Sequence, residues 1–249
     1  QLREISGTFN VNGFLVSSDG RRALVGIGDR RSLRLVDLEC GNVIPTFADS
    51  LQLSCSQALS PDGRMVAYLR RGDQSVRLYD ADSGEELRTL AEPGVRSALA
   101  WSPDGRVLAM HGADNTVRFL DTGNWELKGT YADRSPTPLY LGFTPDSSAL
   151  IHIGLDAKLR IVETSGRLLK TFEESITGTR QVAFSRDGRR VTVLTTDGKM
   201  LVFDVSTRRQ LREISGTLNV NGLLVSSDAR RDSRRGRTGP LARPAFSAL

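Results

Sequence analysis

The sequence predicts an all-β chain: a β-propeller of four-stranded antiparallel blades, with about five full repeats of ~42 residues plus a partial sixth. Three observations lead to this prediction. A four-residue signature of the type Ser/Thr-x-Asp-Gly recurs six times, at steps of 41 to 43 residues. Short runs rich in Val, Leu and Ile alternate with turn residues between the signatures, and no segment keeps a 3.6-residue apolar period. A repeat of this length with four strands is typical of a propeller blade.

Each signature predicts the tight turn that joins the first two strands of a blade. Pro favours the backbone angle of such a turn, Asp bonds to nearby backbone amides, and Gly adopts a positive φ. The copies are SSDG at 17–20, SPDG at 60–63, SPDG at 102–105, TPDS at 144–147, SRDG at 185–188 and SSDA at 226–229.

The third repeat shows the four expected strands in order. They are SALAWS (97–102), VLAMHGA (107–113), TVRFLDT (116–122) and LKGTY (127–131). The second and third strands of the neighbouring repeats follow the same plan, as VAYLR/VRLYD, LIHIG/LRIVE and VTVLT/MLVFD. The units lie near 7–48, 49–91, 92–132, 133–173 and 174–215, with a partial unit at 216–229.

The chain carries one segment twice. Residues 1–22 and 210–231 differ only at Phe9/Leu218, Phe14/Leu223 and Gly20/Ala229. We interpret QLREIS as the outermost strand of a blade, and the rest as the innermost strand and hairpin of the next blade. Either 210–215 completes the fifth blade, or 1–6 pairs with 219–225 in an incomplete sixth. The simplest hypothesis is that the chain is a piece of a longer propeller.

The basic charge of the chain lies in its last 20 residues. Residues 230–249 hold six arginines and one aspartate, whereas the other 229 residues hold 28 basic and 28 acidic side chains. We expect 1–229 to be the propeller and 230–249 to be a disordered tail rich in Arg, Gly and Pro; a frame-shifted or spliced end is an alternative origin. Nucleic acid is expected as a partner only through the tail arginines. These are Arg230, Arg231, Arg234, Arg235 and Arg237.

No stretch of 18 apolar residues is present, so no membrane-spanning helix and no membrane partner are expected. Cys40 and Cys55 lack metal-ligand spacing. We interpret them as two buried thiols in a reducing compartment, and expect a cytoplasmic protein.

Two charged positions recur in the repeats. An Asp follows the second strand of every full unit, where it can accept hydrogen bonds from turn amides; the alternative is a ring of carboxylates for a metal or a cationic ligand. These residues are Asp29, Asp73, Asp114, Asp156 and Asp197. An Arg lies three residues before the acid that ends the third strand, and we interpret these Arg–acid sets as solvated charges with weak neighbouring pairs. They are Arg34/Asp37, Arg77/Asp80, Arg118/Asp121 and Arg160/Glu163. A basic binding stripe through Arg77, Arg118 and Arg160 is the alternative.

No catalytic residue, metal site or cofactor is predicted. The chain has two histidines, His111 and His152, at closely related positions of neighbouring units, and we expect both to be core or surface residues. The sequence contains no HExxH, GxSxG or phosphate-binding Gly-rich loop. Trp101 is expected in the core, whereas Trp125, in a loop, is a candidate anchor for a partner.

The repeats resemble those of WD-repeat β-propellers over roughly residues 6–228. The resemblance rests on the hairpins, the turn Asp and the phrase SVRLYDADSGEELRTL (75–90), together with VD, YD, LD, VE and FD where the family often has Trp-Asp. The Gly-His pair that opens a typical repeat is absent, so the usual hydrogen-bonded tetrad cannot form. The repeats are therefore of a divergent, bacterial style, and a propeller family of other ancestry with S-x-D-G hairpins is the alternative.

The resemblance implies a non-catalytic interaction scaffold that binds a protein or peptide partner on the propeller face or rim. One alternative is an enzyme or cofactor-binding propeller, lactonase- or quinoprotein-like, with ligands that converge at the channel mouth. The other is contact with nucleic acid through the basic tail.

Overall fold

The strands of the computed structural model make five four-stranded sheets. The structure describes residues 11–17, 19–27, 32–44, 57–70, 75–90, 95–132, 138–173, 176, 178–185 and 187–215. In every sheet the strands follow chain order and neighbours are antiparallel. All regular elements of the described residues are strands, so the prediction of an all-β chain built from four-stranded blades is confirmed.

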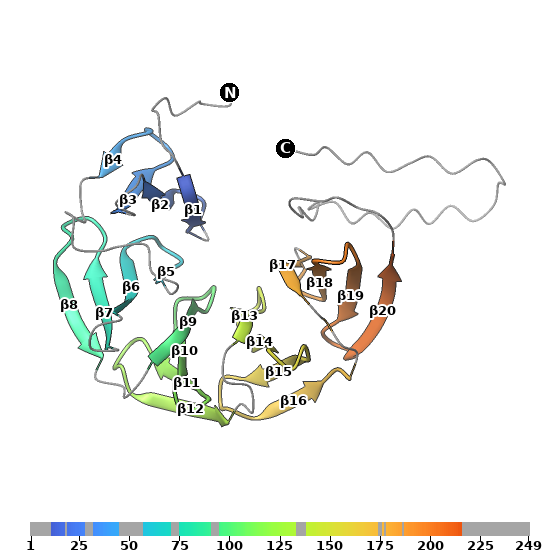
Figure 1. Ribbon diagram of the computed structural model, residues 1–249. Helices are drawn as coiled ribbons and strands as arrows, with labels where there is room; N and C mark the ends of the chain where they lie inside the picture. The colour runs from blue at the N-terminus through green and yellow to red at the C-terminus, as the bar shows by residue number, and fades with distance from the viewer. Residues whose placement is uncertain are drawn as a thin grey trace, which may run out of the picture. The chain divides into compact units, whose positions relative to one another are not determined.

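The chain divides into two compact units, and each is described by itself. Unit 1 comprises residues 1–171 and unit 2 comprises residues 172–249. Unit 1 contains blades 1 to 4, and unit 2 contains blade 5 (Figure 1). Each sheet lies within one of the five expected repeats. The partial sixth unit, the second copy of the duplicated segment beyond 215 and the basic tail lie outside the described residues, as do residues 1–10.

The strand bounds are as follows. Blade 1 has β1 (Val11–Val16), β2 (Arg22–Ile27), β3 (Ser32–Asp37) and β4 (Val43–Ile44). Blade 2 has β5 (Gln57–Leu59), β6 (Met65–Arg70), β7 (Ser75–Asp80) and β8 (Glu86–Leu90). Blade 3 has β9 (Val95–Trp101), β10 (Val107–Gly112), β11 (Thr116–Asp121) and β12 (Leu127–Ala132). Blade 4 has β13 (Pro138–Phe143), β14 (Ala149–Gly154), β15 (Leu159–Glu163) and β16 (Leu168–Thr171). Blade 5 has β17 (Thr179–Phe184), β18 (Arg190–Thr195), β19 (Met200–Asp204) and β20 (Arg209–Ile214).

The recurring signature closes the first hairpin of each blade through a hydroxyl–carboxylate network. In blade 2 the Ser60 hydroxyl donates to Asp62 Oδ1 at 2.6 Å and accepts the Met65 N–H at 2.8 Å. Asp62 Oδ1 also accepts the Arg64 N–H at 3.1 Å, and Gly63 has φ +69°. The same network occurs at Ser17/Asp19, Ser102/Asp104, Thr144/Asp146 and Ser185/Asp187. The predicted turn is confirmed, and the hydroxyl proves to be as much a part of it as the Asp.

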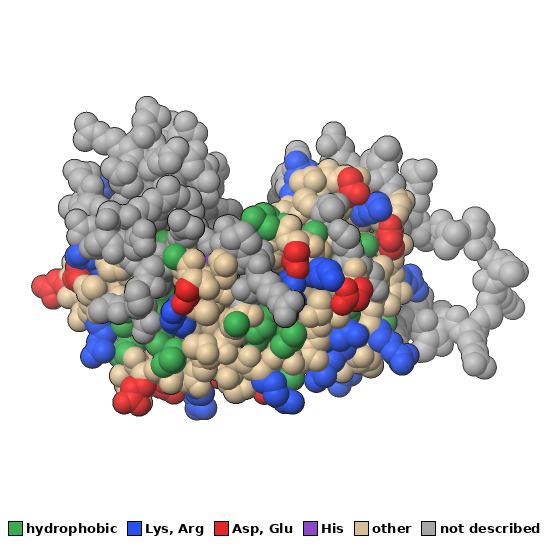
Figure 2. All heavy atoms as spheres, turned by 60° about the horizontal axis from the view of Figure 1, so that its bottom comes forward, with side chains coloured by type: hydrophobic (Ala, Val, Ile, Leu, Met, Phe, Trp, Pro, Cys, Tyr) green, Lys and Arg blue, Asp and Glu red, His purple; other side chains and the backbone are tan. Residues whose placement is uncertain are grey.

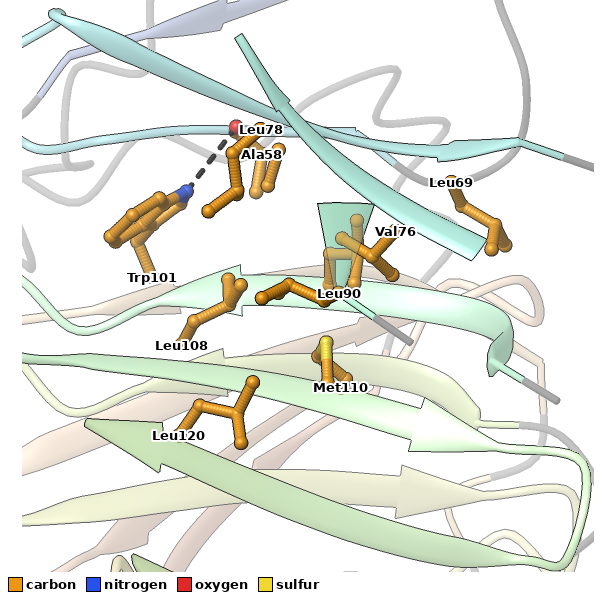
Figure 3. Packing of buried hydrophobic residues seen from close by; sticks show 11 residues of the cluster. Ala58, Leu69, Val76, Leu78, Leu90, Trp101, Leu108, Met110 and Leu120 are labelled. Atoms are coloured by element: carbon orange, nitrogen blue, oxygen red, sulfur yellow. Dashed lines mark hydrogen bonds between the residues drawn. The ribbon is translucent and has the colours of Figure 1, made fainter. Parts of the chain in front are cut away.

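Blades 2 and 3 of unit 1 bury both faces of their sheets against their neighbours. Alternate residues of a strand point to opposite faces, so an apolar strand can fill two interfaces at once. Between blades 2 and 3 the Trp101 indole N–H donates to the Ala58 carbonyl at 3.3 Å (Figure 3). Around this bond lie Leu69, Val76, Leu78, Leu90, Leu99, Leu108, Met110 and Leu120, all buried. Burial of each such leucine contributes about 1.5–3 kcal/mol.

The outer part of the interface between blades 3 and 4 is a contact of backbone with backbone. A Cβ at Gly129, in β12, would lie 2.8 Å from the Thr164 carbonyl oxygen and still closer to the backbone of Ser165. On the other side, a Cβ at Gly166 would collide with the Thr130 carbonyl. Glycine at both positions therefore lets the edge strand of blade 3 lie directly on the last turn of blade 4.

One expectation about the cysteines is wrong. Cys40 is exposed, because it lies in the turn between β3 and β4, where its backbone N–H is held by the carboxylate of Asp37 at 3.0 Å. Turn residues face solvent even when their sequence neighbours are apolar. Cys55 lies outside the described residues.

Candidate functional site

Each blade has two ends, and the charged residues singled out in the sequence divide between them. We call the end with the signature turn and the turn between the third and fourth strands the signature end. The turn between the second and third strands lies at the other end, here called the turn-Asp end. Asp114, Asp156 and Asp197 lie at the turn-Asp end of blades 3, 4 and 5. Trp125 lies in the turn between β11 and β12, at the signature end. The arginine and tryptophan candidates therefore do not form one site.

In blade 3, Asp114 holds both its own turn and Arg118. Asp114 Oδ1 accepts the Thr116 hydroxyl at 2.6 Å and the Thr116 N–H at 3.2 Å. Both carboxylate oxygens accept hydrogen bonds from the Arg118 guanidinium, one of them at 3.1 Å. The hydrogen bonds from Arg118, and then from Thr116, hold the pKa of Asp114 well below its usual value of 3.8. Asp114 is thus fixed as a carboxylate by four donors.

Blade 4 repeats this arrangement. The Arg160 guanidinium donates to both oxygens of Asp156, at 3.0 Å for Nη1 to Oδ1, and to the Lys158 carbonyl at 3.3 Å. The Arg160 side chain is 9% exposed and that of Arg118 is 13% exposed. A bidentate pair of this kind fixes the arginine in one geometry.

The other blades depart from this arrangement. In blade 5 the residue that matches Arg160 is Leu201, and Asp197 instead accepts the Thr195 hydroxyl and lies 3.9 Å from the Lys199 ammonium. In blade 2 Arg77 donates to Glu86 at 2.6 Å. Asp29 and Asp73 lie outside the described residues, and Arg34 is half-buried in β3.

The interpretation of the arginines as solvated charges with weak neighbouring pairs is wrong for Arg118 and Arg160. Both are largely buried and bind the turn Asp four residues before them. The acids that end the third strand serve the next turn instead: Asp80 Oδ1 accepts the N–H groups of Asp82 and Ser83 at 3.0 and 2.8 Å. Asp37, Asp121 and Asp204 accept turn amides in the same way. The Arg and the acid that ends the same strand are three residues apart, so their side chains lie on opposite faces of the strand. Each therefore binds a partner on its own face.

Two exposed leucines lie at the turn-Asp end of blade 4. Leu155 follows Gly154 in the turn and is 54% exposed, and Leu139 in β13 is 41% exposed. The register pairs Pro138 with Gly154 and shifts at Leu139, so Leu139 and Leu155 each follow one residue of the same strand-end pair. Leu155 directly precedes Asp156, which binds Arg160. This end of blade 4 therefore carries two exposed leucines and an ordered ion pair.

The two histidines meet in the interface between blades 3 and 4. Both are fully buried, and their rings stack with centroids 6.3 Å apart and planes 14° apart. Tyr131 lies edge-on to His152, also at 6.3 Å. Counted from their signatures, His111 is one position further along its strand than His152, so the two point to opposite faces of their own blades and toward each other. Of the two expected places, core or surface, both histidines lie in the core, and their contact follows from this offset.

Trp125 is half-buried at the signature end. It lies 6.1 Å from Trp101 with the planes at 84°, and it packs against the cluster between blades 2 and 3. Its φ of +63° occupies the position where blades 1 and 2 have Gly41 and Gly84. Packing on Trp101 offsets this backbone strain, which gives Trp125 a structural role in addition to its exposed surface.

Within the described residues, no group of three or more His, Cys, Asp or Glu side chains is arranged to hold a metal ion. No described helix is long and apolar enough to cross a membrane. On the face in Figure 2, Lys and Arg side chains are interspersed with Asp and Glu, with isolated apolar side chains among them.

The four-stranded repeats, the S-x-D-G hairpins and the turn-Asp network define a WD-repeat-like β-propeller. A family model described as the lipoprotein LpqB beta-propeller domain matches residues 34–211, and the chain belongs to this family. The resemblance inferred from the repeats is therefore confirmed.

The relatives are WD-repeat proteins of modest identity. An uncharacterized WD repeat-containing protein of Synechocystis sp. is 28% identical over 138 residues, which are 55% of this chain and 39% of the relative. The COMPASS component SWD3 of Saccharomyces cerevisiae is 25% identical over 171 residues, 67% of this chain and 53% of the relative. The chain therefore spans about two fifths to one half of the length of these relatives.

A solved structure shares the fold. Hydrazine synthase of Kuenenia stuttgartiensis superposes with a TM-score of 0.63 at 17% identity, over 82% of this chain and 66% of that chain. At this identity the likeness concerns the fold alone.

Proposed function

We propose that the chain is a non-catalytic interaction module that binds a protein or peptide through the turn-Asp end of its blades. The observation that carries the proposal is that Leu139 and Leu155 are exposed at the same end of blade 4 as the Asp156–Arg160 ion pair. An apolar centre with a polar rim is the usual anatomy of a protein–protein interface.

The charged groups favour binding over chemistry. Asp114 and Asp156 are both used in full to hold a turn and an arginine, so neither is available as a general base or a metal ligand in this arrangement. The frame that they build is rigid, and a rigid frame lowers the entropy lost when a partner docks. Arg118 and Arg160 hold Asp114 and Asp156, whose side chains are 47% and 38% exposed, as the charged border of the contact.

The relatives support the same class of function. Several are WD repeat-containing proteins, and one is named as a component of a complex, COMPASS, in yeast. For this chain the partner is a protein or peptide with an apolar side chain at the centre of its contact.

A site-specific photo-cross-linker tests the proposal. A benzoylphenylalanine at Leu155 is compared with one at Leu127, which lies in β12 and has the same exposed fraction of 54%. In the native host, we expect a specific protein to be cross-linked at 155 and not at 127, and Leu139→Glu to lower that yield at least five-fold. The same proteins at both positions, or cross-links only at 127, would contradict the proposal.

A further inference from the structure

The duplicated segment gives the chain a second copy of its first strand. Residues 11–17 read VNGFLVS and residues 220–226 read VNGLLVS, a single difference of Phe14 to Leu223. The first of these contains β1, whose place in blade 1 is known. We propose that residues 220–225 of one copy of this chain pair with β2 of a second copy, in the place and register of β1.

β1 is held by groups that the second copy also has. As the first strand of its sheet it pairs only with β2, in a register that matches Leu15 with Leu24 and Val16 with Ala23. Leu15 packs against the cluster of Leu24, Leu33 and Leu35. Leu224 and Val225 are identical to Leu15 and Val16, so the same residues face the same side when the register is kept.

The residue that follows β1 also has an identical counterpart in the second copy of the segment. The Ser17 hydroxyl accepts the Arg22 N–H at 3.0 Å, and the Ser17 N–H donates to the Arg22 carbonyl at 2.9 Å. Ser226 stands at the equivalent place and offers the same groups. An exchanged strand therefore loses no hydrogen bond that the described part of β1 makes to β2.

The second copy of the strand comes directly after the last described blade of the chain. Residues 210–214 form part of β20, the last strand of blade 5, so the segment 220–225 follows that blade after five residues. On the β2 of another copy it joins the last blade of one chain to the first blade of the next, in the order that blades have within a chain. Such a contact is heterologous, with different surfaces on the two copies, and it can repeat from copy to copy.

The intact hairpin competes with this exchange. The turn at 17–21 holds β1 beside β2 at an effective concentration in the millimolar range, so exchange needs a concentrated protein. That turn depends on Gly20, which has φ +72°, and a Cβ added to this residue would meet no atom within 4 Å. Alanine there strains the hairpin without a collision and leaves the exchanged strand, which does not use the turn, unaffected.

Disulfide trapping tests the proposal with two full-length chains in which Cys40 and Cys55 are replaced by Ser. One chain carries Ala23→Cys and the other, with a different tag, carries Val225→Cys. Opposed residues of antiparallel strands lie at a spacing that a disulfide can bridge. We expect the mixed disulfide dimer to form at roughly 0.1–1 mM protein, and Gly20→Ala in the acceptor chain to raise its yield about five-fold.

Two controls make the result specific. Leu224→Cys is one residue out of register with Ala23→Cys and should give little mixed dimer. Gly41→Ala changes another glycine of positive φ, in the turn after β3, and should not raise the yield. The proposal is overturned if Leu224→Cys and Val225→Cys cross-link equally, if no mixed dimer forms, or if one chain that carries both Ala23→Cys and Val225→Cys closes only on itself.

Discussion

The ion pair of Asp114 and Arg118 shows how a single turn can order a long side chain. The carboxylate accepts four hydrogen bonds, two from its own turn and two from the arginine, which is thereby fixed in a largely buried position. Arg160 and Asp156 repeat the arrangement one blade further on. The stability that such a carboxylate contributes depends on its charge, and hence on pH.

We expect the variant Asp114→Asn to weaken the dependence of stability on acid. The pKa of Asp114 is lower in the folded chain than its usual 3.8, so its contribution is present above that pH and is lost as the pH falls below it. Asparagine does not titrate. The free energy of unfolding in urea should therefore fall less between pH 7 and pH 3 for the variant than for the wild type. Asn115→Ala, in the same turn, should shift both values equally; identical slopes for Asp114→Asn and wild type would contradict the assignment.

The sequence predicts which Asp and Arg positions recur in the blades better than it predicts which of these residues bind one another. The recurrence of Asp after the second strand is visible in the repeats, and so is that of Arg in the third strand. The spacing from Asp114 to Arg118 and from Asp156 to Arg160 is also visible, and the offset of three places the acid beyond each Arg on the opposite face of the strand. The burial of the two arginines is not visible in the spacing, because it depends on the packed blade.

At the scale of the element, the signature hairpin is a repeated polar unit in an apolar fold. Its hydroxyl accepts one backbone amide and donates to the Asp, which accepts a second amide, so three groups close the turn at once. Pro, Asp and Gly can be assigned roles from turn chemistry alone. The hydroxyl cannot, because its amide partner is five residues away across the hairpin. Its presence in each of the six copies as Ser or Thr is the signal that identifies it.

We expect Ser102→Ala to destabilise the chain by about 1–3 kcal/mol, because it leaves the buried Val107 N–H without its acceptor and removes one of the two hydrogen bonds that Asp104 Oδ1 accepts. The measurement is the free energy of unfolding in urea, with an unchanged m-value. Ser165→Ala removes an exposed hydroxyl that donates to Glu163 and should change stability by less than about 0.5 kcal/mol. Equal effects of the two substitutions would mean that the hydroxyl does not hold the hairpin.

At the scale of the whole molecule, three apolar clusters of unit 1 each join two adjacent blades. The cluster that contains Leu108 takes residues from blades 2 and 3 alone, and both tryptophans of the chain lie at it. A repeat structure of this kind transmits a local loss mainly to the adjacent repeats.

The variant Leu108→Ala should accordingly lower the local stability of blades 2 and 3 in unit 1. Loss of a fully buried leucine costs about 2–5 kcal/mol, and hydrogen exchange should accelerate in β6, β7, β10 and β11. Exchange in β18 and β19, in unit 2, should change little. Tryptophan fluorescence should report the same loss as the amides of blades 2 and 3. Uniform acceleration over all five blades would show a single cooperative unit instead.

The architecture of the blades follows from period and strand pattern, because each repeat carries its own turns and its own two-faced strands. The contacts between blades do not follow, because they depend on which face of each strand meets the next blade. Gly129 and Gly166 illustrate this: each resembles an ordinary turn or edge glycine in the sequence, yet together they allow the closest contact between blades 3 and 4.

The stacked histidines also fix the order of the repeats. His111 faces forward from the third repeat and His152 faces back from the fourth, so they meet only because these repeats are consecutive in this order. If the two repeats were exchanged by recombination, the imidazoles would be carried to faces that point apart, and each would be buried against a surface that evolved for another neighbour. The third and fourth repeats look interchangeable in sequence, but their facing surfaces are complementary only in this order. A gene with the two repeats exchanged would need substitutions at both histidines to restore close packing between the blades.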